Sequence, residues 1–247
     1  MWMMQERENK MVCYYLDHSG FAFHTGSRWL IFDYFTDAPQ NGTLADGVIA
    51  PAAFSGEQVF VFVSHRHHDH FNPVIFSWRE QIRNITYILS DDVPAQEDTV
   101  RVSPHQVYRI QDMTVETLES TDEGVAFLIW VDGLCLYFAG DLNHWHWEGE
   151  PDWYNRDMKE KYLSEMERLR GTKIDFAFVP VDPRLGDAFY LGAKGVMETT
   201  DVNALIPMHV WGDYSVVGRL KGHPEAEKWK DKVLSVSRRG EKIFDSH

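Results

Sequence analysis

The 247-residue sequence predicts an α/β fold in which two β-sheets pack face to face, with helices outside and a site at the strand ends. Short apolar runs rich in β-branched residues outnumber helical patterns, which favours a strand-dominated chain. Two of these runs, QVFVFVSH and LYFAGD, pass directly from apolar to polar residues, so both strands end in candidate ligands. Because no linker-like stretch divides the chain, we expect one domain over residues 1–247.

The N-terminal third predicts strands and one helix. Residues 11–35 indicate two aromatic-rich strands, MVCYYLDHSGFAFHTG, interrupted at Ser19-Gly20, and RWLIFDYF. Residues 36–47 contain helix and strand breakers and are typical of a loop. QVFVFVSH follows as a buried strand, since its length and its β-branched residues disfavour a helix. A helix is expected over residues 73–83.

The middle of the chain predicts an antiparallel region followed by a helix. ITYILS, TVRVS, QVYRI and MTVETLES are four strand signals separated by turns. VAFLIWVDGLCLYFAGD predicts a hairpin, because Asp132-Gly133 suits a tight two-residue turn. Residues 154–170 predict an amphipathic helix that Gly171 ends. Its apolar face is formed by residues three and four apart: Met158, Tyr162, Met166 and Leu169.

The C-terminal part predicts alternating strands and helices. IDFAFVPV and ALIPMH read as strands, and AKGVMETT between them reads as a short helix. HPEAEKWKDKV predicts a last helix with a solvated charged face. VLSVSR is a candidate edge strand.

Composition narrows the classes of function. The 38 acidic and 24 basic residues give a formal charge of -14, which disfavours nucleic-acid and anionic-membrane partners and leaves a small-molecule substrate. No apolar run is long enough to span a membrane, and the start, MWMMQERENK, has no apolar core of a secretion signal. With two isolated cysteines, Cys13 and Cys135, we expect a cytoplasmic protein with free thiols.

The most informative segment is Ser64–His70, which reads SHRHHDH. It places three imidazoles and a carboxylate in the pattern HxHxDH directly after a buried strand. Imidazole and carboxylate are ligands for zinc, iron or manganese. His65 and His67 are two apart, so their side chains project to one side of an extended segment, and Asp69 and His70 follow as the chain turns. The segment therefore predicts a metal site.

SHRHHDH resembles the signature loop of the metallo-β-lactamase superfamily. Three further segments match that family in chain order: LIFDYF ends an early strand at Asp33, LYFAGDLN leads to Asp141, and ALIPMHVW leads to His209. The resemblance spans about Tyr14 to Gly212. It implies a four-layer αβ/βα sandwich with one or two metal ions at the sheet edges.

Carried over by motif, the resemblance implies a role for each ligand. His65 and His67 would bind a first metal, and Asp69, His70 and His209 a second, with Asp141 between them. The family's third His for the first metal has no counterpart here, because the matching stretch is LESTDEG. Thr121 stands near that position and Asp122 is the nearest substitute ligand. Alternatives are a weak first site, or His144 or His146 in its place.

Other residues have two interpretations each. Asp33 suits a carboxylate that orients a ligand imidazole, or a turn cap. His18, in DHSGF, resembles a GHSSF-like segment of the branch that includes an ascorbate-phosphate lactonase, or is an ordinary core or surface histidine. Arg184 suits an anion clamp or an ion pair with Asp182 or Asp187. Residues 145–170 suit a lid, a covering helix or a contact in a homo-oligomer.

The resemblance implies a metal-dependent hydrolase, with zinc as the expected ion and manganese or iron as alternatives. Metal-bound hydroxide would attack a small-molecule lactone, ester or phosphate ester, with Asp69 orienting it and His144 as candidate proton donor. Two other functions fit the same residues: an iron-dependent redox protein, and a non-catalytic metal-binding module with a degenerate first site. The substrate cannot be inferred from a fold alone.

Overall fold

The computed structural model describes residues 10–94 and 96–246. Its strands form two sheets, each mixed in direction. The first sheet has the order β13-β1-β2-β3-β4-β5-β6, and the second has the order β12-β11-β10-β9-β8-β7. The expectation that the first residues carry no secretion signal concerns mainly residues 1–9, which lie outside the described part.

The strand bounds follow the predicted apolar runs closely. The first sheet contains β1 (Val12–Asp17), β2 (Gly20–His24), β3 (Trp29–Phe32), β4 (Gln58–Val63), β5 (Asn84–Ser90), β6 (Thr99–Val102) and β13 (Glu241–Asp245). The second contains β7 (Val107–Ile110), β8 (Met113–Glu119), β9 (Val125–Val131), β10 (Leu134–Phe138), β11 (Lys173–Pro180) and β12 (Asp201–Met208).

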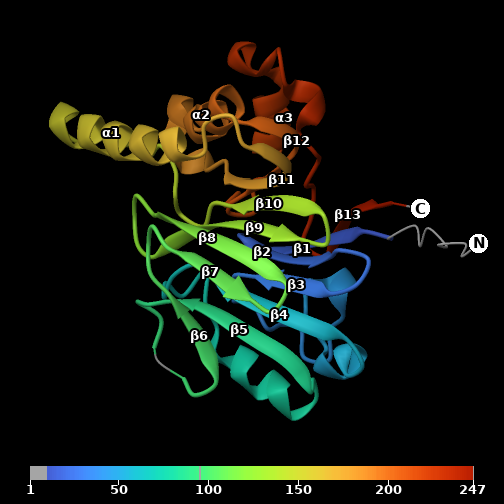
Figure 1. The fold of residues 1–247 in the computed structure, drawn as a ribbon. Helices are drawn as coiled ribbons and strands as arrows, with labels where there is room; N and C mark the ends of the chain where they lie inside the picture. The colour runs from blue at the N-terminus through green and yellow to red at the C-terminus, as the bar shows by residue number, and fades with distance from the viewer. Residues whose placement is uncertain (1–9, 95, 247) are drawn as a thin grey trace, which may run out of the picture.

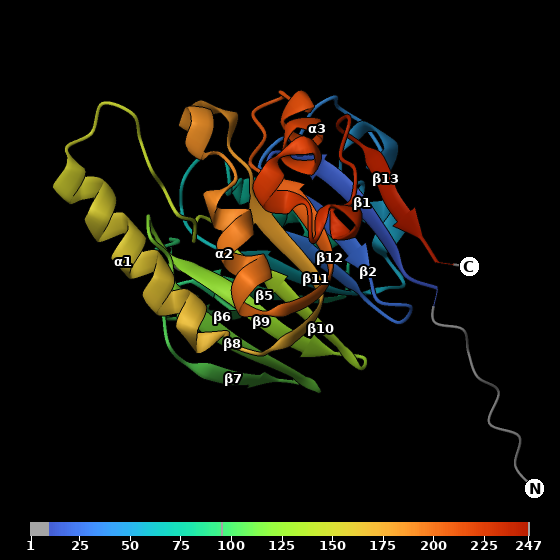
Figure 2. The ribbon, with the colours of Figure 1, turned by 90° about the horizontal axis from the view of Figure 1, so that it is seen from above.

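Helices cover the outer face of each sheet, which completes four layers. On the second sheet lie α1 (Asp152–Arg168), α2 (Leu191–Thr199) and α3 (Ser215–Gly222), at the top of Figure 1 and in front in Figure 2. The opposite face of the first sheet packs against short 3-10 helices, chiefly η2 (Pro51–Phe54) and η3 (Pro73–Glu80). The remaining 3-10 turns are η1 (Leu44–Asp46), η4 (Pro183–Ala188), η5 (Pro224–Ala226) and η6 (Lys230–Lys232).

Strand alternation divides the core into two clusters. In β4, Phe60 and Phe62 point between the sheets, whereas Val59, Val61 and Val63 point to the outer cluster with η3. This follows from the period of two along a strand. Between the sheets, the rings of Phe32 and Phe138 stack with centroids 4.6 Å apart. The sandwich fold predicted from the sequence is therefore confirmed.

Most predicted elements are confirmed, including the Asp132-Gly133 hairpin turn, where both residues have positive φ. The predicted first strand is wrong in one respect, because it forms two strands that turn at His18 and Ser19. Its Ser19-Gly20 interruption is the start of an antiparallel hairpin, since His18 has φ of 50°.

The predictions for the C-terminal region are partly wrong. HPEAEKWKDKV forms two 3-10 turns rather than one helix, because the buried Trp229 between them has a non-helical φ of -136°. The helix in this region is α3, which was not predicted. VLSVSR is not a strand: Val233 makes a single bridge to Leu205, and the edge of the first sheet is β13.

In each sheet, the parallel strands that precede the predicted ligands end at the same edge. β3 and β4 are parallel neighbours in the first sheet, and β10, β11 and β12 are parallel neighbours in the second. Carboxyl ends of parallel strands meet at a common edge. The polar residues that follow these five strands are therefore brought together. Among the described residues, no helix is long and apolar enough to cross a membrane.

Candidate metal centre

The end of β4 is fixed to the end of β3 by Asp33. Both the backbone N–H and the hydroxyl of Ser64 donate to the Asp33 carboxylate, at 2.7 and 2.6 Å. Asp33, Ser64 and the neighbouring His65 are all fully buried. The first imidazole of the motif therefore leaves the strand from an anchored backbone.

Two glycines of the second sheet allow its backbone to approach this segment. A Cβ on Gly124, which has φ of 72°, would lie 2.0 Å from the Ser64 carbonyl oxygen and 2.6 Å from His65 Cβ. A Cβ on Gly140 would lie 2.7 Å from Ser64 Cβ. Val125 N–H also donates to the Ser64 carbonyl at 2.9 Å. The turn before β9 and the end of β10 thus contact the motif directly.

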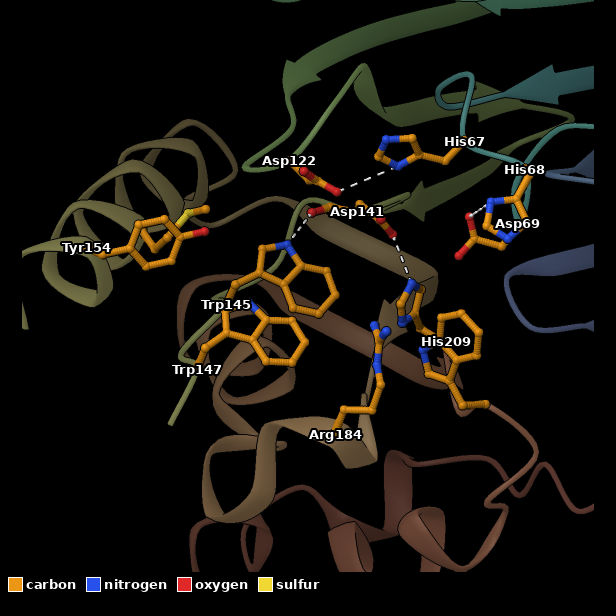
Figure 3. Close-up of a pocket in the computed structure, with 12 residues that line it drawn as sticks. His67, His68, Asp69, Asp122, Asp141, Trp145, Trp147, Tyr154, Arg184 and His209 are labelled. Atoms are coloured by element: carbon orange, nitrogen blue, oxygen red, sulfur yellow. Dashed lines mark hydrogen bonds and ion pairs between the residues drawn. The ribbon is translucent and has the colours of Figure 1, made fainter. Parts of the chain in front are cut away.

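Asp141 lies at the centre of the imidazoles. Its Oδ2 is 3.6 Å from His65 Nε2, and its Oδ1 is 3.2 Å from His70 Nε2 and 3.4 Å from His209 Nε2. Figure 3 shows the carboxylate between His209 on one side and His67 with Asp122 on the other. Residues from β4, β10 and β12 therefore converge on one carboxylate.

These separations match donors that share a cation. Two donors bound to one zinc ion in a tetrahedron at ~2.1 Å lie ~3.4 Å apart. His65 Nε2, His70 Nε2 and Asp141 Oδ1 are buried and have no hydrogen-bond partner in the described part of the chain. Buried polar atoms ordinarily have partners, so these atoms require one that is not a protein group. The donor set fits a divalent transition metal.

The donors include two groups that meet at Asp141, which belongs to the first. One consists of His65, His67 and Asp141, and the other of His18, Asp69, His70 and His209; within each, the ligand atoms lie within 4.8 Å of one another. The predicted ligands except Asp122 are therefore gathered in this way. His18 belongs to the second group. Of the two interpretations of His18 from the sequence, the one that places it near the site therefore agrees with the structure.

A buried carboxylate orients one imidazole of each sheet. His70 Nδ1 lies 2.7 Å from Asp33 Oδ2, and His209 Nδ1 lies 2.9 Å from Asp182 Oδ2. Each carboxylate accepts the Nδ1–H, so each ring points its Nε2 lone pair at the centre. The sequence analysis did not assign this role to Asp182. The signal was present, because Asp182 directly follows the apolar run IDFAFVPV, as Asp33 directly follows LIF.

Asp182→Asn is expected to weaken metal binding about 10- to 100-fold, the usual effect of losing such an orienting carboxylate. Burial opposes ionisation of Asp182, but hydrogen bonds from His209 and Arg184 outweigh it and lower its pKa to about 2. The carboxylate therefore stays ionised at pH 7, and an amide cannot replace it. Chelator competition measures the affinity; the matched control is Asp187→Asn, and equal affinities in both variants would contradict the role.

The protonation states of two buried rings, His65 and His18, suit metal binding, whereas His70 would lose a proton when it binds metal. Burial lowers the pKa of His65 to about 3 and that of His18 to about 4. Both imidazoles are therefore neutral near pH 7 and retain the lone pair that coordination needs. Burial lowers the pKa of His70, but Asp141 and Asp33 outweigh burial and raise it well above its usual value. Burial raises the pKa of Asp141, but His70 and His209 outweigh burial and hold it well below its usual value.

The position of the absent third His is occupied by Thr121, which is not oriented as a ligand. Its hydroxyl donates to the backbone carbonyl of Asn143 at 2.7 Å, so it fastens the loop after β8 to the loop after β10. Asp122 Oδ2 lies 3.7 Å from His67 Nδ1 but outside the group that contains His65 and Asp141. Asp122 therefore stands beside the first group, at its exposed side.

The structure does not support His144 as a proton donor. Its ring stacks on Tyr162 of α1, with centroids 5.6 Å apart, and it does not line the cavity over the metal groups. Burial lowers its pKa to about 4, so it carries no proton to donate near pH 7. The prediction for His144 followed from its closeness to Asp141 in the sequence, but the chain turns the ring away.

A cavity of about 480 Å³ opens over the centre. Its walls are aromatic, cationic and acidic: His67, His68, Asp69, Asp122, Asp141, Trp145, Trp147, Tyr154, Met158, Arg184, His209 and Trp211. Figure 3 shows the rings of Trp145 and Trp147 beside the Arg184 guanidinium. α1 contributes Tyr154 and Met158 and buries its later residues in the core, so it is at least a covering helix.

Arg184 forms an ion pair with Asp182, which was one of the two alternatives expected from the sequence. Its Nη2 and Nε lie 2.5 and 2.9 Å from Asp182 Oδ2, and its guanidinium lies over the Trp211 ring at 4.3 Å. The same Asp182 carboxylate also accepts a hydrogen bond from His209. Asp182 therefore positions both Arg184 in the cavity wall and His209 in the second group of donors.

Comparison with known proteins agrees with this architecture. A model of the β-lactamase superfamily domain matches residues 13–152. No curated protein matches the chain in sequence. Similar solved structures include a provisionally named metal-dependent hydrolase from Parabacteroides distasonis, with 17% identity, coverage of 92% of this chain and 93% of that one, and a TM-score of 0.63.

Two further solved structures are similar over almost the whole chain. The metallo hydrolase Igni18 from Ignicoccus hospitalis has 15% identity, coverage of 96% and 99%, and a TM-score of 0.60. The metallo-β-lactamase fold protein YhfI from Bacillus subtilis has 14% identity with the same coverages and TM-score. At these identities the likeness concerns the fold.

Proposed function

The chain belongs to the metallo-β-lactamase superfamily, and on that premise we propose that it is a metal-dependent hydrolase of a small-molecule lactone, ester or phosphate ester. The observation that carries the proposal is the set of buried, unpartnered donors around Asp141. Two of them, His65 Nε2 and His70 Nε2, lie at ligand-pair distances from its carboxylate, with no hydrogen bond among the described residues.

Each group of donors would hold one ion. His65, His67 and Asp141 would hold the first, and Asp69, His70 and His209 the second, with Asp141 between them. Asp122 would approach the first ion from the exposed side. Nitrogen and oxygen donors of this kind suit zinc, and manganese or iron accept the same set.

The ions and the residues would divide the chemistry. Bound metal lowers the pKa of a coordinated water from about 15.7 toward about 7 and polarises a substrate oxygen. Asp69 lines the cavity with its side chain 15% exposed, so its carboxylate can accept a hydrogen bond from the attacking water. Trp145 and Trp147 line the cavity as well, with their rings stacked 5.9 Å apart, and would limit the access of water to the substrate.

The cavity and the charge favour a small substrate. A volume of about 480 Å³ is within the usual range for small-molecule sites. The formal charge of -14 opposes approach of a nucleic acid or an anionic membrane surface. Two buried free thiols, Cys13 and Cys135, are compatible with the reducing cytoplasm that we propose as its location.

The test combines metal analysis with a substrate panel. Protein purified without added metal is analysed for bound zinc, manganese and iron, and is then assayed on lactones, thioesters and phosphodiesters before and after chelation. We expect hydrolysis that chelation abolishes and one of these metals restores. Iron with oxygen-dependent turnover would instead indicate a redox protein, and little metal without turnover would indicate a binding module.

A further inference from the structure

His18 occupies a position for which neither the motif nor the hydrolase proposal has a role. It lies in the turn between β1 and β2, far in sequence from the other donors, and its side chain is buried. Its Nε2 is among the buried atoms that lack a hydrogen-bond partner within the described ranges. A buried ring nitrogen without a partner is unfavourable and needs an explanation.

We propose that His18 is a further metal ligand, binding the second ion together with Asp69, His70 and His209. This inference rests on the proposed function, because it presumes that the centre binds metal. Its main support is geometric: one ligand atom from each of the four residues lies within 4.8 Å of the others. His18 Nε2 lies 3.5 Å from Asp69 Oδ2.

The distance to Asp69 distinguishes a ligand from a hydrogen-bond donor. Hydrogen bonds from N–H to oxygen are about 2.7–3.2 Å long, so 3.5 Å is too long for a good one. It is close to the ~3.4 Å that separates two donors on one tetrahedral ion. A similar separation recurs between Asp141 and two of its imidazoles, at 3.6 Å to His65 and 3.4 Å to His209. The His18–Asp69 pair therefore has the spacing of the predicted ligand pairs.

The surroundings of His18 hold its ring in this direction. The residue adopts φ of 50°, and its carbonyl accepts a hydrogen bond from the backbone N–H of His209 at 3.0 Å. Its ring lies against those of His209 and Trp211, with centroids 4.0 and 4.5 Å away. The β1–β2 turn is thereby fastened to the segment after β12, which delivers His209.

A fifth donor would make the two ion positions unequal. The second ion would have four residues of its own and a share of Asp141. The first would have His65 and His67 with Asp141, while Asp122 lies outside that group at its exposed side. Zinc sites filled by four protein ligands are typically structural, and sites with three keep a position for water. The first ion would therefore be the one that exchanges water and substrate, beside the half-exposed His67 at the cavity.

The test compares His18→Ala and His18→Gln with the wild-type chain, using Zn²⁺ and Co²⁺ as probes. Both variants are expected to bind the second ion at least 10-fold more weakly in chelator competition, and to change the visible spectrum of the Co²⁺ form. The glutamine amide can still donate a hydrogen bond to Asp69 but is a poor ligand for these ions. Wild-type affinity in His18→Gln would therefore overturn the ligand role.

Two controls separate this inference from the hydrolase proposal. His24→Ala removes a histidine from the other end of β2, and it should leave both the affinity and the spectrum unchanged. His70→Ala removes a predicted ligand of the same ion. If His70→Ala loses metal and His18→Ala binds as the wild type does, only the inference on His18 fails. If His70→Ala also retains full metal, the metal centre itself is refuted. Thermal unfolding in excess chelator confirms that each variant is folded.

Discussion

Asp141→Asn is expected to give a folded protein that has lost metal at both positions and more than about 99% of its hydrolytic activity. Asp141 is the one carboxylate within 3.2–3.6 Å of His65, His70 and His209 in the described structure. Asparagine keeps the shape but removes the negative charge that both ions would share. Loss of an outer carboxylate weakens a metal site about 10- to 100-fold, and loss of a direct, shared ligand should exceed that range.

Elemental analysis and kcat/KM on the best panel substrate measure this effect. The matched control is Asp157→Asn on α1, where an exposed carboxylate forms an i,i+4 ion pair with Lys161, at 2.7 Å. Such exposed pairs contribute little to stability, so this variant should retain metal and activity. Wild-type metal content in Asp141→Asn would contradict the proposed centre.

Gly124→Ala is expected to cause the largest effect of a single methyl group on this centre. The added Cβ would lie 2.0 Å from the Ser64 carbonyl oxygen and 2.6 Å from His65 Cβ, and both are buried parts of the metal-binding loop. A left-handed backbone at an alanine costs about 1–2 kcal/mol, and overpacking a filled core adds about 1–3 kcal/mol. Since backbone cannot rotate away, the strain should displace His65 and weaken the first ion.

Gly133→Ala separates the two contributions. Gly133 has φ of 79°, close to the 72° of Gly124, but its added Cβ would meet nothing within 4 Å. It should therefore lose only the part of the stability due to backbone strain and should keep its metal. Chemical denaturation and metal titration of both variants measure the difference. Equal loss of stability with unchanged metal affinity in the two variants would show that the close approach to Ser64 is unimportant.

Several parts of the fold could be predicted because their causes are local. The alternation in QVFVFV places Phe60 and Phe62 on one face and the valines on the other, whatever the rest of the chain does. Asp132-Gly133 accepts positive φ at both positions, so the hairpin between β9 and β10 could be recognised from two residues. The cluster SHRHHDH indicated metal because its residue types and spacing suffice for that inference.

Other features of the structure depended on packing rather than on local pattern. α3 has no strong sequence signal, and the charged stretch after it looked more helical. That stretch instead forms two 3-10 turns, separated by the buried Trp229 with a non-helical φ of -136°. His144 follows Asp141 by three residues in the sequence, but contact with Tyr162 decides where its ring points.

The strand pattern, the residue types of the metal site and the family resemblance could all be inferred from the chain alone. Each depends on side chains that are near one another along the chain. Three contacts became visible only in the folded chain: Asp182 orients His209, Thr121 holds the loop after β8 to the loop after β10, and His18 lies in the second group. These contacts require two sheet edges to meet and His18 to adopt φ of 50°. Such a conformation is uncommon for a residue other than glycine, and no local pattern here predicted it.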